Sequence, residues 1–162
     1  MERTCVLYCD LHGHSRKPNV FMYGCDKKGA PEETRLFPLL LSKISPLFDF
    51  ASSRFGVQKS KEATARVAVF KELKTCMLVY TMESTFSGLD KGPYSGLHIS
   101  TDMLESMGRD LCRALLIQCN LEVPKELQSM PTKGKKPSKT FSADPPSDGE
   151  TLVLNQHALS IK

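Results

Sequence analysis

The sequence predicts an α/β fold in which helices flank a mixed β-sheet, followed by a disordered C-terminal tail. Two short apolar runs, at residues 5–9 and 19–24, are bounded by turn residues and are typical of strands. After residue 101 the apolar spacing changes to that of an amphipathic helix. We therefore predict one folded domain over residues 1–120 and a disordered segment over residues 121–162.

The first predicted strand, at residues 5–9, is apolar enough to lie inside a sheet that is covered on both faces. Strand side chains alternate, so Asp10, His12 and His14 share one face if the chain stays extended beyond residue 9. Imidazole and carboxylate groups at a strand end are typical ligands of a divalent metal, and zinc is the commonest ion in histidine-rich sites. The alternative is a solvated turn, because His-x-His spacing has low specificity.

The second predicted strand, at residues 19–24, is followed by a turn at residues 26–29. Pro31 and the two glutamates after it are typical of the first turn of a helix. We expect this helix to continue through the apolar residues 36–41.

Two further strands are predicted at residues 66–70 and 77–82, and a loop punctuated by glycine follows at residues 87–96. Glu83 comes directly after the last strand, where side chains leave a sheet for a cleft. A glutamate at this place can act as the general base for a metal-bound water. The alternative is a solvated residue at the edge of the sheet.

The long helix is predicted to begin near Thr101, where Asp102 and Glu105 have the spacing of a capping box. Its apolar residues recur on one face, at Leu104, Met107, Leu111 and Leu115. Beyond residue 120 come a basic block at 133–139 and an acidic block at 144–150, neither of which can form a core.

The 162-residue chain is 40% hydrophobic, which is sufficient for one globular core. Its six cysteines form no CxxC pair and no signal peptide is recognised, so we expect reduced thiols in the cytoplasm. No apolar stretch approaches the length of a membrane span, so we expect a soluble protein. The net charge of +4 is compatible with an acidic partner, and we expect neither a nucleic acid nor a membrane as partner.

Five motifs stand out along the chain: YCDLHGHSRK at 8–17, NVFMYGC at 19–25, VQKSKE at 57–62, RV at 66–67 and YTMESTF at 80–86. Taken together, they resemble the cytosolic carboxypeptidases, the tubulin-deglutamylating branch of the zinc carboxypeptidases. The motifs follow the family's order across residues 5 to about 119, and their combination is far more specific than any one of them. The resemblance implies a partial zinc-carboxypeptidase fold, the C-terminal half of the catalytic domain.

The resemblance also implies roles for individual residues. His12 matches the family's third zinc ligand, and Glu83 matches the glutamate that activates the zinc-bound water. His14 falls in the wall of the substrate cleft, and Asp10 would orient a neighbouring ligand. Because the family trims glutamate from acidic, polyglutamylated protein tails such as that of tubulin, we expect such tails as partners.

Arg66 is the residue that we expect to bind the glutamate side chain, because a guanidinium can hold a carboxylate with two hydrogen bonds. Lys59 and Lys61, in the preceding loop, would add diffuse attraction. The alternative for Arg66 is a surface arginine at the end of a strand.

Two alternatives to an active carboxypeptidase stay open. The family takes its other two zinc ligands from an HxxE motif in the N-terminal half of the domain, and the sequence contains no such motif. We therefore expect the chain alone to be inactive, and a truncated member acting as an interaction protein is one alternative. The other is a structural zinc site formed by Cys9, His12, His14 and Cys25, although strand alternation places Cys9 and His12 on opposite faces.

Overall fold

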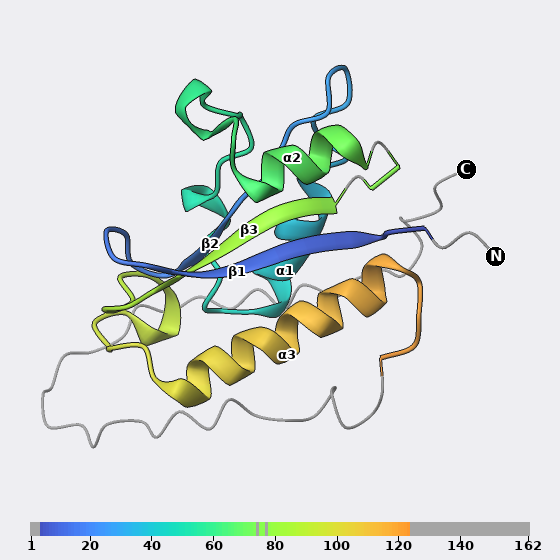
Figure 1. The fold of residues 1–162 in the computed structure, drawn as a ribbon. Coiled ribbons are helices and arrows are strands. Elements are labelled where there is room, and N and C mark those ends of the chain that lie inside the picture. Colours follow the sequence, from blue (N-terminus) through green and yellow to red (C-terminus); the bar gives the residue numbers. More distant parts are fainter. Residues whose placement is uncertain (1–3, 74, 77, 124–162) are drawn as a thin grey trace, which may run out of the picture.

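The computed structural model describes residues 4–73, 75–76 and 78–123. A three-stranded sheet lies at its centre, with the strand order β1-β3-β2 (Figure 1). The middle strand β3 (Leu78–Thr85) runs parallel to β1 (Leu7–His14) and antiparallel to β2 (Val20–Tyr23). The mixed sheet of the predicted fold class is therefore confirmed.

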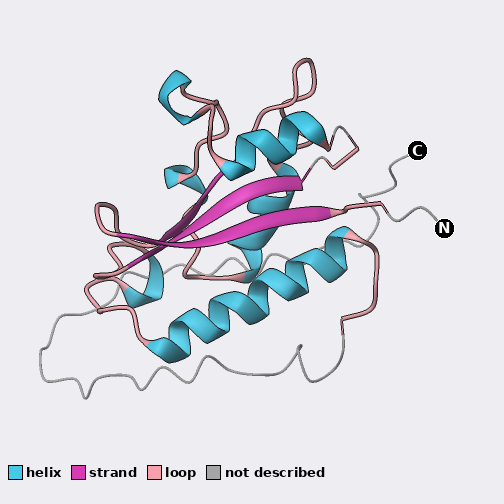
Figure 2. Cartoon of the chain, in the orientation of Figure 1, coloured by secondary structure: helices cyan, strands magenta, loops and turns pink. Residues whose placement is uncertain are grey.

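Helices cover both faces of this sheet (Figures 1 and 2). Helix α2 (Ala65–Glu72) lies on one face, and α1 (Leu36–Ile44) and α3 (Thr101–Gln118) lie on the other. Short 3₁₀ helices form at Phe50–Ser52, Lys59–Lys61 and Gly92–Tyr94. Within the described part of the chain, no helix has the length and apolar character needed to cross a membrane.

The hydrophobic core lies between the sheet and the layer formed by α1 and α3. Tyr80 of β3 is fully buried, stacks on Phe37 of α1 with ring centroids 5.7 Å apart, and donates a hydrogen bond to the Thr34 carbonyl (2.7 Å). Met107 of α3 is buried in the same cluster, where Ser45 Oγ donates to its Sδ (3.6 Å). Side chains on this face of the sheet therefore serve packing, and the α2 face remains available for polar chemistry.

The predicted long helix is confirmed as α3, but its N-cap is Ser100, so the capping box predicted at Asp102 and Glu105 is wrong. The Ser100 hydroxyl accepts a hydrogen bond from the Met103 amide (3.3 Å), and Asp102 lies in the first turn, where negative charge suits the helix dipole. Met107 is buried as expected. Leu104 is 42% exposed, contrary to the prediction, because the helix turns the face that carries Met103 and Met107 toward the core.

Residues 66–70 form part of helix α2, so the strand predicted there is wrong. Val67 and Val69 alternate with other residues, and this local pattern favours a strand. The burial is helical instead: Arg66 and Val67 are buried, and Val69 and Phe70, three residues further on, are half-buried. Packing of Val67 onto the sheet, where it is 1% exposed, outweighs the β propensity of its segment.

Strand β1 extends to His14, whereas the sequence placed its end at residue 9 and its position inside the sheet. Pairing with β3 continues to the His14 carbonyl, which accepts a hydrogen bond from the Phe86 amide (2.9 Å). Among the described residues no strand pairs with the other edge of β1. Leu11, on this strand, is 60% exposed.

Helix α1 begins at Leu36, later than the start predicted at Pro31. Residues 31–35 form turns that are held by Asp26, whose carboxylate accepts hydrogen bonds from Thr34 Oγ1 (3.3 Å) and Arg35 Nε (3.0 Å). The predicted disordered tail lies outside the described residues, except for residues 121–123, which form neither helix nor strand.

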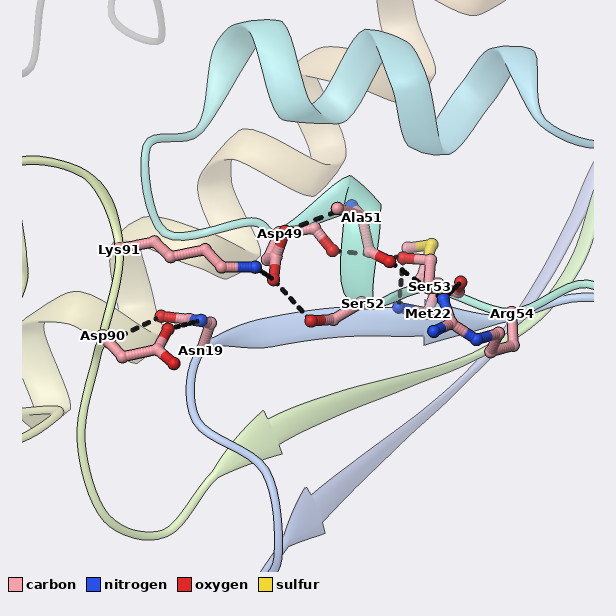
Figure 3. A network of polar contacts seen from close by, with 9 residues as sticks. All are labelled: Asn19, Met22, Asp49, Ala51, Ser52, Ser53, Arg54, Asp90 and Lys91. Atoms are coloured by element: carbon pink, nitrogen blue, oxygen red, sulfur yellow. Dashed lines mark hydrogen bonds and ion pairs between the residues drawn. The ribbon is translucent and has the colours of Figure 1, made fainter.

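A polar network ties the loop after β3 to Asn19, which precedes β2, and to the segment that follows α1 (Figure 3). The Asp49 carboxylate accepts hydrogen bonds from Lys91 Nζ (2.6 Å) and Ser52 Oγ (2.5 Å). Asn19 exchanges two hydrogen bonds with Asp90, from its Nδ2 to the carboxylate (2.5 Å) and from the Asp90 amide to its Oδ1 (3.1 Å). Because Asn19 directly precedes β2, the network fixes where this strand starts.

Candidate functional site

A cavity of about 570 Å³ opens on the α2 face of the sheet. Its floor consists of side chains from β1 and β3, and one wall is formed by the start of α2 and the loop before it. The lining includes five residues to which the sequence analysis assigned chemical roles: Asp10, His12, His14, Arg66 and Glu83.

Strand register brings these side chains together. In the parallel pairing of β1 with β3, Asp10 lies opposite Thr81 and His12 lies opposite Glu83. Strand alternation then places Asp10, His12 and His14 on one face, which is the arrangement predicted for an extended chain. The Nε2 atom of His12 lies 3.3 Å from Asp10 Oδ1, with His12 55% and Asp10 28% exposed.

Glu83 is the more buried carboxylate of the cavity, at 13% exposure. Its Oε2 lies 3.6 Å from His14 Nδ1, and the His14 ring meets the fully buried Phe21 ring edge-on, with centroids 5.1 Å apart. Phe21 therefore holds the imidazole beside the carboxylate. Two groups that can accept or donate a proton thus lie side by side on the cavity floor.

Arg66 lies in the first turn of α2, not on a strand, and it is 6% exposed. Its Nη1 donates hydrogen bonds to the Gly24 carbonyl and to Cys25 Sγ (3.3 Å), and its guanidinium lies 5.9 Å from the centre of the Tyr23 ring. The alternative of a surface arginine is therefore excluded. These contacts join α2 to the end of β2 and fix the guanidinium in the cavity wall.

Arg54 also lines the cavity, and the sequence analysis missed it because it belongs to no recognisable motif. Its Nη1 donates to the carbonyls of Ala51 (2.9 Å) and Ser53 (2.7 Å) (Figure 3). Lys61 lines the same wall, whereas Lys59 is not part of the lining. The cavity therefore carries three cationic side chains facing a floor with two carboxylates.

The described residues do not complete a metal site. Nowhere in the described ranges do three or more histidine, cysteine, aspartate or glutamate side chains group so as to hold a metal ion. His12 is an accessible imidazole with a carboxylate beside it, which is suitable chemistry for one ligand of a zinc ion. A catalytic zinc needs three protein ligands, so the remaining donors would have to come from elsewhere.

The alternative of a structural zinc site at Cys9, His12, His14 and Cys25 is contradicted by the fold. Cys9 packs against the core on the α1/α3 face, whereas both histidines line the cavity on the other face. Burial raises the pKa of the Cys9 thiol to about 12, and burial also raises the pKa of Cys25. Both thiols are therefore protonated at neutral pH, and all six cysteines are free.

Known sequences that are similar to this chain include several cytosolic carboxypeptidases. Mouse cytosolic carboxypeptidase 3 is 40% identical over 168 aligned positions, which cover 99% of this chain and 16% of the relative. Cytosolic carboxypeptidase 2 of Xenopus tropicalis is 49% identical over 74% of this chain, and human cytosolic carboxypeptidase 1 is 45% identical over 78% of it. These alignments span only 12% and 11% of the two relatives. No protein-family model matches the chain.

Comparison with solved structures supports the same fold. A metallo-carboxypeptidase from Burkholderia cenocepacia superposes with a TM-score of 0.60 and 20% identity, covering 72% of this chain and 31% of that protein. A metallo-carboxypeptidase from Pseudomonas aeruginosa, in complex with (2-guanidinoethylmercapto)succinic acid, gives a TM-score of 0.58 and 23% identity over 69% of this chain. The described fold is thus a part of the metallo-carboxypeptidase fold.

Proposed function

The chain belongs to the cytosolic carboxypeptidase family, and we propose that it supplies the C-terminal part of a zinc metallocarboxypeptidase catalytic domain. The proposed reaction is the removal of C-terminal glutamates from acidic, polyglutamylated protein tails such as that of tubulin. A cytoplasmic location follows from the same proposal. The chain spans 11–16% of the length of the curated relatives named above, and under this proposal residues outside the chain complete the active site.

One observation carries this proposal: His12 and Glu83 lie opposite each other on parallel strands, on the floor of one cavity. A zinc ion held partly by His12 would polarise the scissile carbonyl and acidify a bound water. Glu83 would take the proton from the attacking water and deliver it to the leaving amine. His14, 3.6 Å from Glu83, would form part of the substrate-binding wall, and Asp10 would orient the His12 ring.

The charge of the cavity wall supports an acidic substrate. Arg66 is fixed by its bonds to Gly24 and Cys25, so its remaining donors are pre-organised for a carboxylate. Lys61 and Arg54 add positive charge on the same side. Three cations close to one wall favour a glutamate side chain over a neutral one.

A chimera tests the proposed function. The segment of mouse cytosolic carboxypeptidase 3 that aligns with this chain would be replaced by this chain, and glutamate release from a peptide with a polyglutamate C-terminus would be measured. We expect stoichiometric zinc and glutamate release. The same chimera with Glu83→Gln is the control, which should retain zinc and lose turnover. A chimera that binds zinc stoichiometrically but releases no glutamate would contradict the proposal.

A second candidate is a non-catalytic interaction protein, favoured by the incomplete ligand set among the described residues. In that case the chain alone would bind polyglutamate peptides through the cationic wall. Titration of the purified chain with a labelled polyglutamate peptide, and with a matched polyglutamine peptide, distinguishes the two. Tight binding by the chain alone, together with an inactive chimera, would favour the interaction protein.

A further inference from the structure

Cys5 and Cys76 lie opposite each other, just before the two strands that form the cavity floor. Cys5 comes two residues before β1, and Cys76 comes two residues before β3. The parallel pairing matches Leu7 with Leu78, and the same register places Cys5 opposite Cys76. Opposed residues on neighbouring strands are about 5 Å apart, which is a Cα separation that a disulfide can span.

The two thiols share one face of the sheet. Leu7 and Leu78 pack in the core between the sheet and the layer of α1 and α3, and side chains two residues apart along a strand face the same side. Each thiol also donates a hydrogen bond to the carbonyl two residues later, Cys5 Sγ to Leu7 (3.6 Å) and Cys76 Sγ to Leu78 (3.8 Å). The two side chains therefore have the same local hydrogen bond at equivalent places before neighbouring strands.

The two thiols also act on each other. Burial raises the pKa of the Cys76 thiol, and the neighbouring Cys5 thiol raises it further. Cys76 is 2% exposed, whereas Cys5 is half-buried. A small disulfide in solution therefore reaches Cys5 first, and Cys76 is placed to react with the product.

Cysteines that are nearer to each other in the sequence are farther apart in the fold. Cys112 lies on α3 and Cys119 is the C-cap of this helix, so seven residues separate them by about 10 Å along the helix axis. Cys5 and Cys9 lie four residues apart in extended chain, which corresponds to about 13 Å. Both separations exceed what a disulfide spans, so the fold favours Cys5 and Cys76 over either of these pairs.

We propose that Cys5 and Cys76 form a reversible disulfide when the chain meets an oxidised low-molecular-weight disulfide such as oxidised glutathione. The Cys5 thiolate attacks one sulfur of the oxidised glutathione, which gives a mixed disulfide on Cys5 and releases one reduced glutathione. The Cys76 thiolate then attacks Cys5 Sγ and displaces the second glutathione. The two cysteines lose two protons and two electrons, and one oxidised glutathione takes them up as two reduced glutathiones.

Closing this disulfide fixes the register of β1 against β3. The register that places Cys5 opposite Cys76 also pairs His12 with Glu83, seven residues further along each segment. A slip by one residue would turn the side chains of one strand to the other face of the sheet. The disulfide therefore holds the strands in the arrangement that forms the cavity floor, and it does not rest on the proposed carboxypeptidase function.

A redox titration of the purified 162-residue chain tests the proposal. The chain is equilibrated in glutathione buffers of increasing oxidised fraction, free thiols are trapped with N-ethylmaleimide, and linked tryptic peptides are identified by mass spectrometry. Fragmentation of the peptides distinguishes Cys5 from Cys9, because one tryptic peptide contains both. The same titration is repeated in about 8 M urea, where the chain is unfolded.

We expect the link between Cys5 and Cys76 to dominate in native buffer. In urea the short loop between Cys112 and Cys119 should close instead, because loop closure costs less entropy for a short loop than for a long one. The equilibrium constant of the Cys5–Cys76 link should be at least about tenfold higher in native buffer than in urea. By the thermodynamic cycle, the disulfide raises the folding equilibrium constant by the same factor.

Three variants check the order of the two steps. Cys76→Ser should stop at the mixed disulfide on Cys5, and Cys5→Ser should leave the buried Cys76 unmodified. Cys112→Ser, at an exposed position on α3, is the matched control and should form the link as the wild type does.

The chimera with mouse cytosolic carboxypeptidase 3 carries the same two cysteines and should form the same link. Free Cys5 and Cys76 in the native chain and in the chimera, at every glutathione ratio, would overturn the proposal. An equilibrium constant that is the same in native buffer and in urea would overturn it equally, because the fold would then contribute nothing to the pairing.

Discussion

His12 and Glu83 occupy paired positions on two parallel strands, and both side chains line the same cavity. Paired positions on neighbouring strands are about 5 Å apart, so a group held by one side chain lies within reach of the other. This juxtaposition depends on backbone pairing inside a sheet and not on the conformation of a loop. A carboxylate paired with an imidazole is therefore a rigid feature of the fold.

We expect Glu83→Gln to abolish turnover in an enzyme completed around this segment while leaving its zinc content unchanged. Glutamine keeps the shape of the side chain but cannot accept the proton from water, so kcat should fall about 100- to 10,000-fold. Zinc stoichiometry and initial rates of glutamate release are the measurements. Glu72→Gln, at the exposed end of α2, is the control and should have normal rates. Near-normal turnover by the Glu83 variant would remove this residue from the mechanism.

Arg66→Ala should impair cleavage of a C-terminal glutamate much more than cleavage of a neutral residue. Losing a charge-assisted contact to the substrate carboxylate should cost about 2 to 3 kcal/mol of transition-state binding. The variant should also be less stable, because Arg66 is buried and bonded to Gly24 and Cys25. Comparison of kcat/KM for the two substrates separates these effects, and an equal loss for both would assign Arg66 a structural role only. Lys59→Ala, outside the cavity, should discriminate as the wild type does.

The sequence predicts most of the fold where local pattern and tertiary packing agree. Strands β2 and β3 and helix α3 follow from apolar spacing alone. Helix α2 is missed because Val67 and Val69 favour a strand locally, and only the packing of Val67 on the sheet decides otherwise. The length of β1 is missed because pairing with β3, which carries it through His14, is a long-range property.

The candidate site, too, is predicted only in part from the sequence. Asp10, His12 and His14 follow from strand alternation, which needs no knowledge of the rest of the fold. Arg66 was identified by resemblance, not by its spacing, and its link to Gly24 is invisible in the sequence. Arg54 reaches the cavity only because its segment pairs with the end of β2, where the Gly24 amide donates to the Arg54 carbonyl (2.8 Å).

Gly24→Ala should destabilise the fold. A Cβ at this position would lie 2.6 Å from Phe55 Cδ1, and Phe55 is only 7% exposed, so its ring has little room to move. We expect a loss of about 1 to 3 kcal/mol in the free energy of unfolding, measured by urea denaturation. Gly56→Ala is the matched control, because no atom lies within 4 Å of a Cβ there. A Gly24 variant as stable as the Gly56 variant would show that Phe55 can rearrange at no cost.

Asp49 should make the stability of the chain depend on pH in the acid range. Partial burial opposes ionisation of Asp49, but hydrogen bonds from Lys91 and Ser52 outweigh it and hold the pKa of the carboxyl below its usual value of 3.8. A carboxyl whose pKa is lowered in the folded state stabilises the fold above its unfolded pKa, and this contribution disappears as the pH falls through the folded value. Urea denaturation from pH 7 down to pH 2 should therefore show a smaller acid-induced loss of stability for Asp49→Asn than for the wild type. The variant should also start from a lower stability at pH 7.

Glu33→Gln is the control for Asp49→Asn. Glu33 forms an ion pair with Lys27 in which both side chains are nearly half exposed, and such pairs contribute little to stability. If Asp49→Asn loses as much stability between pH 7 and pH 2 as the wild type, the contact between Asp49 and Lys91 does not anchor the loop after β3.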